Sequence, residues 1–223
     1  MNFNPLLFIA LIFALSSCAF VTQPIKYKET NAITKVTYQK NIDINGTVLL
    51  DVNWGRKWGC GSFENAQLIS LAFDKQPMKT LNNEIEPPLV MHSPSRLMVD
   101  PVFLHYAYSL EPGEYAISAV SIKVAEAGSK VGFFTAQRDK LYVNGKPIGG
   151  TFTVNPKETV YIGSFYLDCA YQPTLWRYYV DGKEAFEAQV KAYNNSFPFL
   201  DLSDVKFRLF KTKEFGNDYE LAP

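Results

Sequence analysis

The hydrophobic positions of this chain form one continuous block near the N-terminus, residues 6–15, and then a long series of short runs. The later runs are rich in β-branched and aromatic residues and are separated by Gly, Pro and Asn. This pattern predicts strands joined by turns. The strands expected on this basis cover residues 47–52, 67–73, 102–110, 114–124, 131–135, 141–143, 151–154, 159–167, 175–180 and 205–211.

Turn residues between these runs predict how some strands connect. Glu111-Pro112-Gly113 predicts a hairpin between residues 102–110 and 114–124, because Pro presets one turn dihedral and Gly tolerates a positive φ. Asn144-Gly145 favours a type I′ turn.

Two loops stand out between the early strands. A Gly-rich loop, residues 54–62, separates the runs at 47–52 and 67–73, which we expect in one sheet. Residues 76–94 contain four prolines and predict a long surface loop.

One helix is predicted near the C-terminus. Asp181 is placed to cap it, Glu184 follows three residues later, and Phe186, Val190 and Tyr193 repeat on one helical face. The fold class expected is therefore mainly β: an antiparallel β-sandwich with one C-terminal helix, formed by residues 41–223 as a single domain.

The apolar block at residues 6–15 is typical of a signal peptide core, because it is followed by small residues and is shorter than the about 20 apolar residues that span a bilayer. Residues 1–5 contain no Lys or Arg, whereas a signal peptide normally begins with a basic residue. One interpretation of this segment is an ordinary cleaved signal peptide or a short anchor, in which Cys18 has no role of its own.

Leu15-Ser16-Ser17-Cys18 resembles the lipobox of bacterial lipoproteins. The resemblance implies a signal peptide over residues 1–17, cleavage before Cys18, and lipid, such as palmitate, on Cys18. Residues 18–40 are polar and are expected to form a lipidated N-terminus and tether. Ala19 stands where an Asp would favour inner-membrane retention, so the resemblance implies an outer membrane lipoprotein facing the periplasm or the cell surface.

The number of cysteines is consistent with export of the protein from the cytoplasm. If Cys18 carries lipid, Cys60 and Cys169 remain as an even pair in an oxidising compartment, which favours a disulfide bond. Two buried free thiols are the alternative.

Charge argues against nucleic acid as a partner. Lys and Arg together number 22, Asp and Glu together number 22, and no basic block appears.

The search for catalytic chemistry assigns no residue. Gly59-Cys60-Gly61-Ser62 has the look of a nucleophile loop, but a thiolate needs a base and His92 and His105 are the only histidines. Their spacing fits no common metal site, and no cofactor is predicted. We expect His105 to be a strand residue with a satisfied hydrogen bond and His92 to be solvated surface. Carboxylate pairs of glycosidases are set by spatial separation and cannot be recognised in a sequence.

Aromatic residues form the remaining candidate site. Trp54 and Trp58 lie in the first Gly-rich loop, and Trp176, Arg177 and Tyr178 follow the second cysteine of the predicted bridge. The bridge would bring both groups together as a platform for a sugar, peptidoglycan or a protein. The alternative is that these rings cover the core.

The segments LEPGEYAISAVSIKV and FTVNPKETVYIGSFYLD resemble uncharacterised proteobacterial lipoproteins with a transthyretin-like or carboxypeptidase-regulatory-like β-sandwich. The residues that carry this likeness are Pro112, Gly113, Tyr115, Tyr161, Ile162 and Gly163. It implies a fold and a location in the envelope, but no catalytic residues.

Together these features predict a membrane-anchored envelope lipoprotein with a non-catalytic binding or scaffolding role and an envelope protein or glycan as its partner. The alternatives are an envelope enzyme or a carbohydrate-binding module that acts on peptidoglycan or another glycan.

Overall fold

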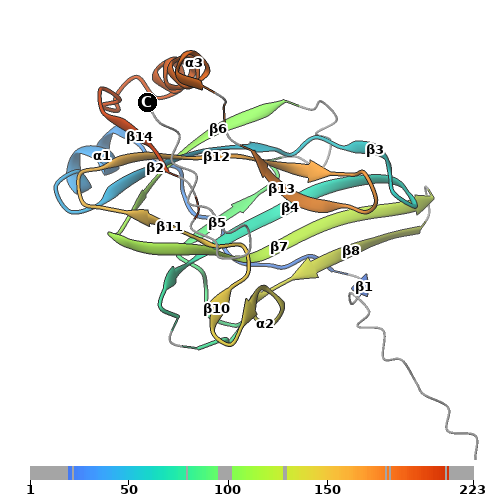
Figure 1. The fold of residues 1–223 in the computed structure, drawn as a ribbon. Coiled ribbons are helices and arrows are strands. Elements are labelled where there is room, and N and C mark those ends of the chain that lie inside the picture. The colour runs from blue at the N-terminus through green and yellow to red at the C-terminus, as the bar shows by residue number, and fades with distance from the viewer. Residues whose placement is uncertain are drawn as a thin grey trace, which may run out of the picture.

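Two β-sheets packed face to face make up most of the protein in the computed structural model (Figure 1). The structure describes residues 20–21, 23–78, 80–94, 102–127, 130–178, 180, 182–208 and 210. The predicted signal peptide, Cys18 and Asp181 lie outside the described residues. The mainly β sandwich with a C-terminal helix is confirmed.

The seven-stranded sheet is antiparallel throughout and has the order β1-β8-β7-β4-β3, with β11 paired to β7 and β5 paired to β4. Its strands are β1 (Phe20–Val21), β3 (Lys57–Cys60), β4 (Phe63–Gln76), β5 (Leu89–His92), β7 (Gly113–Ala127), β8 (Lys130–Ala136) and β11 (Thr151–Val154).

The five-stranded sheet has the order β13-β12-β2-β6, with β14 paired to β12. Its strands are β2 (Gly46–Asn53), β6 (Phe103–Leu110), β12 (Thr159–Asp168), β13 (Thr174–Tyr178) and β14 (Val205–Phe207). Both β2 and β14 run parallel to β12, so this sheet is mixed and not antiparallel as predicted. Parallel neighbours need a crossover connection, which the short turn signals in the sequence do not reveal.

The main core lies between the two sheets. From β2 it receives Val48, Leu50 and Val52, which alternate with Leu49 and Asp51 on the opposite face. Every residue of β2 is nevertheless buried. The outer face of this part of the five-stranded sheet is therefore also covered.

Helix α3 (Gly182–Ser196) supplies that cover and confirms the predicted helix (Figure 1). Its Tyr193 is buried and Phe186 is half-buried in a second apolar cluster that includes Leu49 and Tyr161 of the sheet. Within the described residues, no helix has the length and apolar character needed to cross a membrane.

Two short helices, α1 (Lys35–Asn41) and α2 (Arg138–Leu141), were not predicted. Helix α1 begins with a capping box in which Thr34 and Thr37 exchange hydrogen bonds. Thr37 occupies the place where a sequence search expects Glu or Gln, which explains why the helix start was missed. Helix α2 is followed by the small hairpin of β9 (Tyr142–Val143) and β10 (Lys146–Pro147).

The turn predictions were partly right. Asn144 and Gly145 have φ values of 52° and 74° and close the β9–β10 hairpin as expected. The predicted hairpin of residues 102–110 and 114–124 is wrong, because β6 and β7 lie in different sheets. The pair of strands flanking the Gly-rich loop, β2 and β4, is likewise split between the sheets. Pro and Gly mark a chain reversal, but they do not tell whether the next strand pairs with the previous one or crosses to the facing sheet.

The predicted surface loop at residues 76–94 ends earlier than expected. Residues 89–92 form β5, which pairs with β4, and Leu89, Val90 and Met91 are fully buried. Pro88 comes immediately before this strand, and no residue of the strand is a proline. Each strand residue therefore has the backbone N–H group that proline lacks and that strand pairing uses. His92 is not plain surface either, since its Nε2 atom lies 2.8 Å from the Tyr27 carbonyl oxygen.

The segment expected as a tether packs against the sandwich from Ile25 onward. Ile25, Ile33 and Tyr38 are buried, whereas a tether would leave them in water. The Thr30 amide donates to Val90 of β5 and the Ile33 amide donates to Ala107 of β6, both at 2.9 Å. This segment thus joins an edge of one sheet to an edge of the other.

A disulfide between Cys60 and Cys169 confirms the predicted pairing, with Cα atoms 4.5 Å apart. It links β3 of one sheet to the end of β12 in the other. The bond closes a sequence separation of 109 residues. In the chain-entropy model, closing a loop of this size destabilises the unfolded state by about 4 to 5 kcal/mol.

Candidate functional site

The outer face of the five-stranded sheet carries the most chemistry in the described part of the chain. One register row runs from Tyr178 on β13 through Ser164 on β12 and Asp51 on β2 to His105 on β6. The next row contains Trp176, Tyr166 and, two strands away, Phe103. Residues paired across strands point to the same face, so both rows lie on the side that α3 partly covers.

We call Phe103, Tyr166, Trp176 and Tyr178 the aromatic shelf. The rings of Phe103 and Tyr178 have centroids 5.5 Å apart, those of Tyr166 and Tyr178 are 5.7 Å apart, and those of Phe103 and Tyr166 are 6.4 Å apart. Trp176 pairs with Tyr166 across the strands. Trp176 is 50% exposed and Tyr178 is 40% exposed. The shelf therefore presents aromatic surface to solvent on a rigid sheet.

Beside the shelf, the Asp51 carboxylate lies fully buried at the centre of a hydrogen-bond network. Its Oδ1 atom lies 2.6 Å from Nδ1 of His105 and 2.7 Å from the hydroxyl of Tyr193 on α3. Its Oδ2 atom accepts from the Gln189 side-chain amide of α3 at 2.7 Å. Asp51 therefore joins β2, β6 and α3.

The same Oδ2 atom also receives hydroxyl groups from β12. The hydroxyls of Tyr161 and Ser164 lie 3.1 Å and 3.0 Å from it and 2.8 Å from each other. Burial raises the pKa of Tyr161 and of Tyr193, and the charge of Asp51 adds to both shifts. Both phenols thus stay protonated and donate at neutral pH. An ionised carboxylate only accepts, so its neighbours match it.

His105 is the member of this network that reaches the surface, because its side chain is 28% exposed. Its ring also packs against Tyr193, with centroids 5.0 Å apart. The prediction that His105 is a strand residue with a satisfied hydrogen bond is confirmed. Its partner could not be foreseen, since Asp51 precedes it by 54 residues.

The structure separates the predicted platform residues. Trp54 is fully buried in the main core, where its Nε1 donates to the Tyr106 hydroxyl at 2.7 Å, so its assignment to a binding platform is wrong. Trp58 is 58% exposed, but it lies on β3 of the seven-stranded sheet, with the Arg56 guanidinium 5.4 Å above its ring.

Arg177 also leaves the platform. It lies between Trp176 and Tyr178 on β13, so its side chain points to the opposite face of the strand. Its guanidinium carbon lies 3.4 Å from the centroid of the Phe210 ring and 5.9 Å from that of Phe165. Of the five predicted residues, Trp176 and Tyr178 remain as exposed members of one surface.

The two loops that carry Cys60 and Cys169 lie close together, as predicted. Gly61, with a φ of +62°, lies very close to the loop that follows Cys169. A Cβ atom on Gly61 would stand 2.2 Å from the Tyr171 carbonyl oxygen of that loop. Only glycine tolerates both this conformation and this contact.

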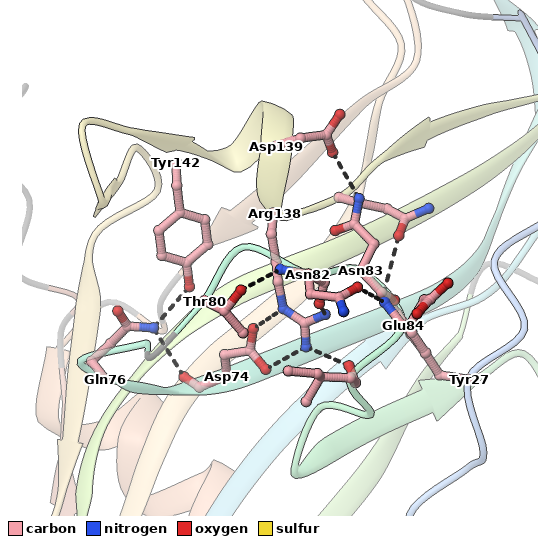
Figure 2. Close-up of polar contacts among 12 residues, drawn as sticks. Tyr27, Asp74, Gln76, Thr80, Asn82, Asn83, Glu84, Arg138, Asp139 and Tyr142 are labelled. Atoms are coloured by element: carbon pink, nitrogen blue, oxygen red, sulfur yellow. Dashed lines mark hydrogen bonds and ion pairs between the residues drawn. The ribbon is translucent and has the colours of Figure 1, made fainter.

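A second buried polar cluster surrounds Arg138 of helix α2, beside β4 of the seven-stranded sheet (Figure 2). The guanidinium donates to both carboxylate oxygens of Asp74, at 2.5 Å from Nε and 3.0 Å from Nη2. It also donates to the carbonyl oxygens of Asn82 and Ile85, each at 2.7 Å. Both ionised side chains are buried, and a buried pair is tolerated when such additional hydrogen bonds complete it.

This cluster holds the loop between β4 and β5 in place. Residues of that loop, such as Pro77, Met78 and Pro88, line an open pocket of about 400 Å³ together with Arg138. The Tyr27 hydroxyl donates to the Asn83 carbonyl oxygen at 2.7 Å and so contacts the same loop (Figure 2). Because the guanidinium is engaged by the protein's own groups, we assign it a structural role. Sequence reasoning missed the pair, since Asp74 and Arg138 are 64 residues apart.

Within the described ranges, no group of three or more His, Cys, Asp or Glu side chains is placed to hold a metal ion. Comparison with family models, curated proteins and solved structures finds no match to the chain. The resemblance to transthyretin-like lipoproteins therefore stays a prediction.

We predict that Asp51→Asn lowers the free energy of unfolding by about 2 kcal/mol or more. The NH₂ group of the asparagine would replace one carboxylate oxygen, and the buried groups that donate to that oxygen would lose their acceptor. Urea denaturation measures the change. Gln189→Ala is the matched control, since it removes one half-buried donor and should cost about 1 kcal/mol. An Asp51→Asn protein as stable as the wild type would contradict this role of the carboxylate.

Proposed function

We propose that the protein is a lipid-anchored lipoprotein of the bacterial envelope that binds a partner, without catalysis, on the outer face of its five-stranded sheet. The observation that carries this proposal is the aromatic shelf beside His105. Exposed aromatic residues that gather on one surface are typical of binding sites, because they bury much apolar area per side chain at low entropic cost.

The shelf is preorganised for binding. Its residues come from β6, β12 and β13, strands of one hydrogen-bonded sheet, and the rings of Phe103, Tyr166 and Tyr178 already contact one another. The Cys60–Cys169 disulfide anchors the end of β12 to the other sheet. A ligand would therefore order few side chains on arrival, which favours affinity.

Binding fits this face better than catalysis. A glycosidase needs two carboxyl groups that reach the substrate from either side of the scissile bond. Asp51, which shares a register row with Tyr178, is 1% exposed and has both oxygens engaged by protein donors, so it is not available to act with the exposed Asp168 of β12. The Ser164 hydroxyl is buried and hydrogen-bonded to Asp51, so it is not available as a nucleophile.

Export is supported by the disulfide, since such bonds persist in oxidising compartments outside the cytoplasm. The lipobox-like segment ending at Cys18 supplies the anchor in this proposal. A cysteine that carries several acyl chains gives stable attachment, because each buried CH₂ contributes about 0.8 kcal/mol and one chain alone binds only marginally.

We predict that Cys18→Ala abolishes incorporation of labelled fatty acid and leaves the unprocessed precursor in place of the mature protein. Labelling with a clickable palmitate analogue and fractionation of the cells measure both. Cys60→Ala is the control and should still be labelled. A Cys18→Ala protein that matures and stays on the membrane as before would refute lipid anchoring through this residue.

We predict that Trp176→Ala with Tyr178→Ala abolishes capture of the partner, because the two most exposed shelf residues are lost. The measurement is affinity purification of the lipidated protein from crosslinked cells, with captured protein and glycan both quantified. Trp58→Ala is the matched control, since it removes an equally exposed tryptophan from the other sheet. Equal capture by the shelf variant and the wild type would rule out the shelf as the binding surface.

A further inference from the structure

The polar neighbour of the aromatic shelf points to the chemistry of its ligand. His105 lies two residues from Phe103 on the same strand and in the same register row as Tyr178. Residues two apart on a strand share a face, so the imidazole stands at the margin of the shelf. A ligand stacked on the rings would have the exposed edge of His105 beside it.

The hydrogen bond to Asp51 sets which group of His105 faces a ligand. An ionised carboxylate only accepts, so the proton of a neutral His105 is on Nδ1, at 2.6 Å from Asp51. The lone pair of the ring is then on Nε2, which has no hydrogen-bond partner among the described residues. His105 therefore offers Nε2 to a ligand, as an acceptor when the ring is neutral and as a donor when it is charged, and a ligand hydroxyl group matches both.

Charge near the shelf selects against an anion. Arg177, which lies between Trp176 and Tyr178, packs on Phe210 at the opposite face of β13. Desolvation raises the pKa of the Tyr166 hydroxyl, and the charge of Asp168 raises it further. Asp168 lies two residues from Tyr166 on β12 and is exposed, so its carboxylate stands on the same face of the sheet as the shelf and repels phosphate and carboxylate ligands.

We propose, on the premise that the shelf is the binding surface, that its ligand is a neutral carbohydrate and that a sugar hydroxyl forms a hydrogen bond with Nε2 of His105. A β-linked pyranose has a flat face of C–H groups that stacks on aromatic rings, and it has equatorial hydroxyl donors at its edge. An acyl chain has no such hydroxyl group, and an acidic sugar meets the charge of Asp168. Asp51 acts through His105 as a positioning residue.

The test is isothermal titration calorimetry of the full chain in detergent with a tetrasaccharide of β-1,4-linked N-acetylglucosamine. We expect saturable binding by the wild type and by Trp58→Ala, and binding at least about tenfold weaker by Trp176→Ala. We expect His105→Phe to bind about fivefold more weakly, since one hydrogen bond is lost while the ring remains.

Two further measurements keep the role of His105 testable if His105→Phe folds poorly. His105→Gln carries a donor and an acceptor on neighbouring atoms, so it should regain most of the affinity. A permethylated tetrasaccharide has no hydroxyl donors, so the wild type and His105→Gln should bind it equally weakly. Loss of binding by His105→Gln together with tight binding of the permethylated ligand would overturn the hydrogen bond.

The outcomes separate this inference from the premise on which it rests. If the shelf variant loses its partner in cells but no protein binds the tetrasaccharide, the carbohydrate is wrong and the binding surface stands. If the shelf variant keeps its partner in cells, the surface itself is wrong. An acidic control, tetragalacturonate, that binds as tightly as the neutral tetrasaccharide would overturn the argument from charge.

Discussion

The buried carboxylate of Asp51 is the constraint on which the outer face of this protein depends. Burying a charge costs several kcal/mol unless hydrogen bonds replace its water, so the surrounding elements have to bring donors to it. Those donors come from β6, β12 and α3. Because they converge on two oxygen atoms, they fix how α3 lies on the sheet. They also fix the plane of the His105 ring at the edge of the covered area.

Helix α3 thereby divides the outer face into two parts. Leu49, Tyr161 and Ala107 lie beneath it in an apolar cluster, whereas the aromatic shelf lies further along the same strands. The shelf needs no cover from the helix, since its rings pack against one another. One sheet face thus serves packing at one end and is open to a ligand at the other.

Sequence pattern predicted the elements better than their partners. The period-two runs placed most strands, the helical repeat placed α3, and cysteine parity predicted the disulfide, because each signal is local or is a simple count. The predicted pairing of β6 with β7 was wrong, since Pro112 and Gly113 can reverse the chain within one sheet or between two sheets. The Asp51 network and the Arg138–Asp74 pair join residues far apart in sequence. The one available signal was Asp51 itself, a charged residue inside an apolar strand, because buried polar residues are the informative exceptions.

The three tryptophans allow the most direct test of the claim that the outer face of the five-stranded sheet binds the ligand, because each lies in a different environment. Trp54 is in the core, Trp58 is exposed on the seven-stranded sheet, and Trp176 is on the shelf. Nuclear magnetic resonance of the isotope-labelled protein resolves the indole N–H signal of each. On titration with the neutral tetrasaccharide, the account predicts that the Trp176 signal shifts while those of Trp54 and Trp58 stay in place. A shift of the Trp58 signal with Trp176 unchanged would contradict it.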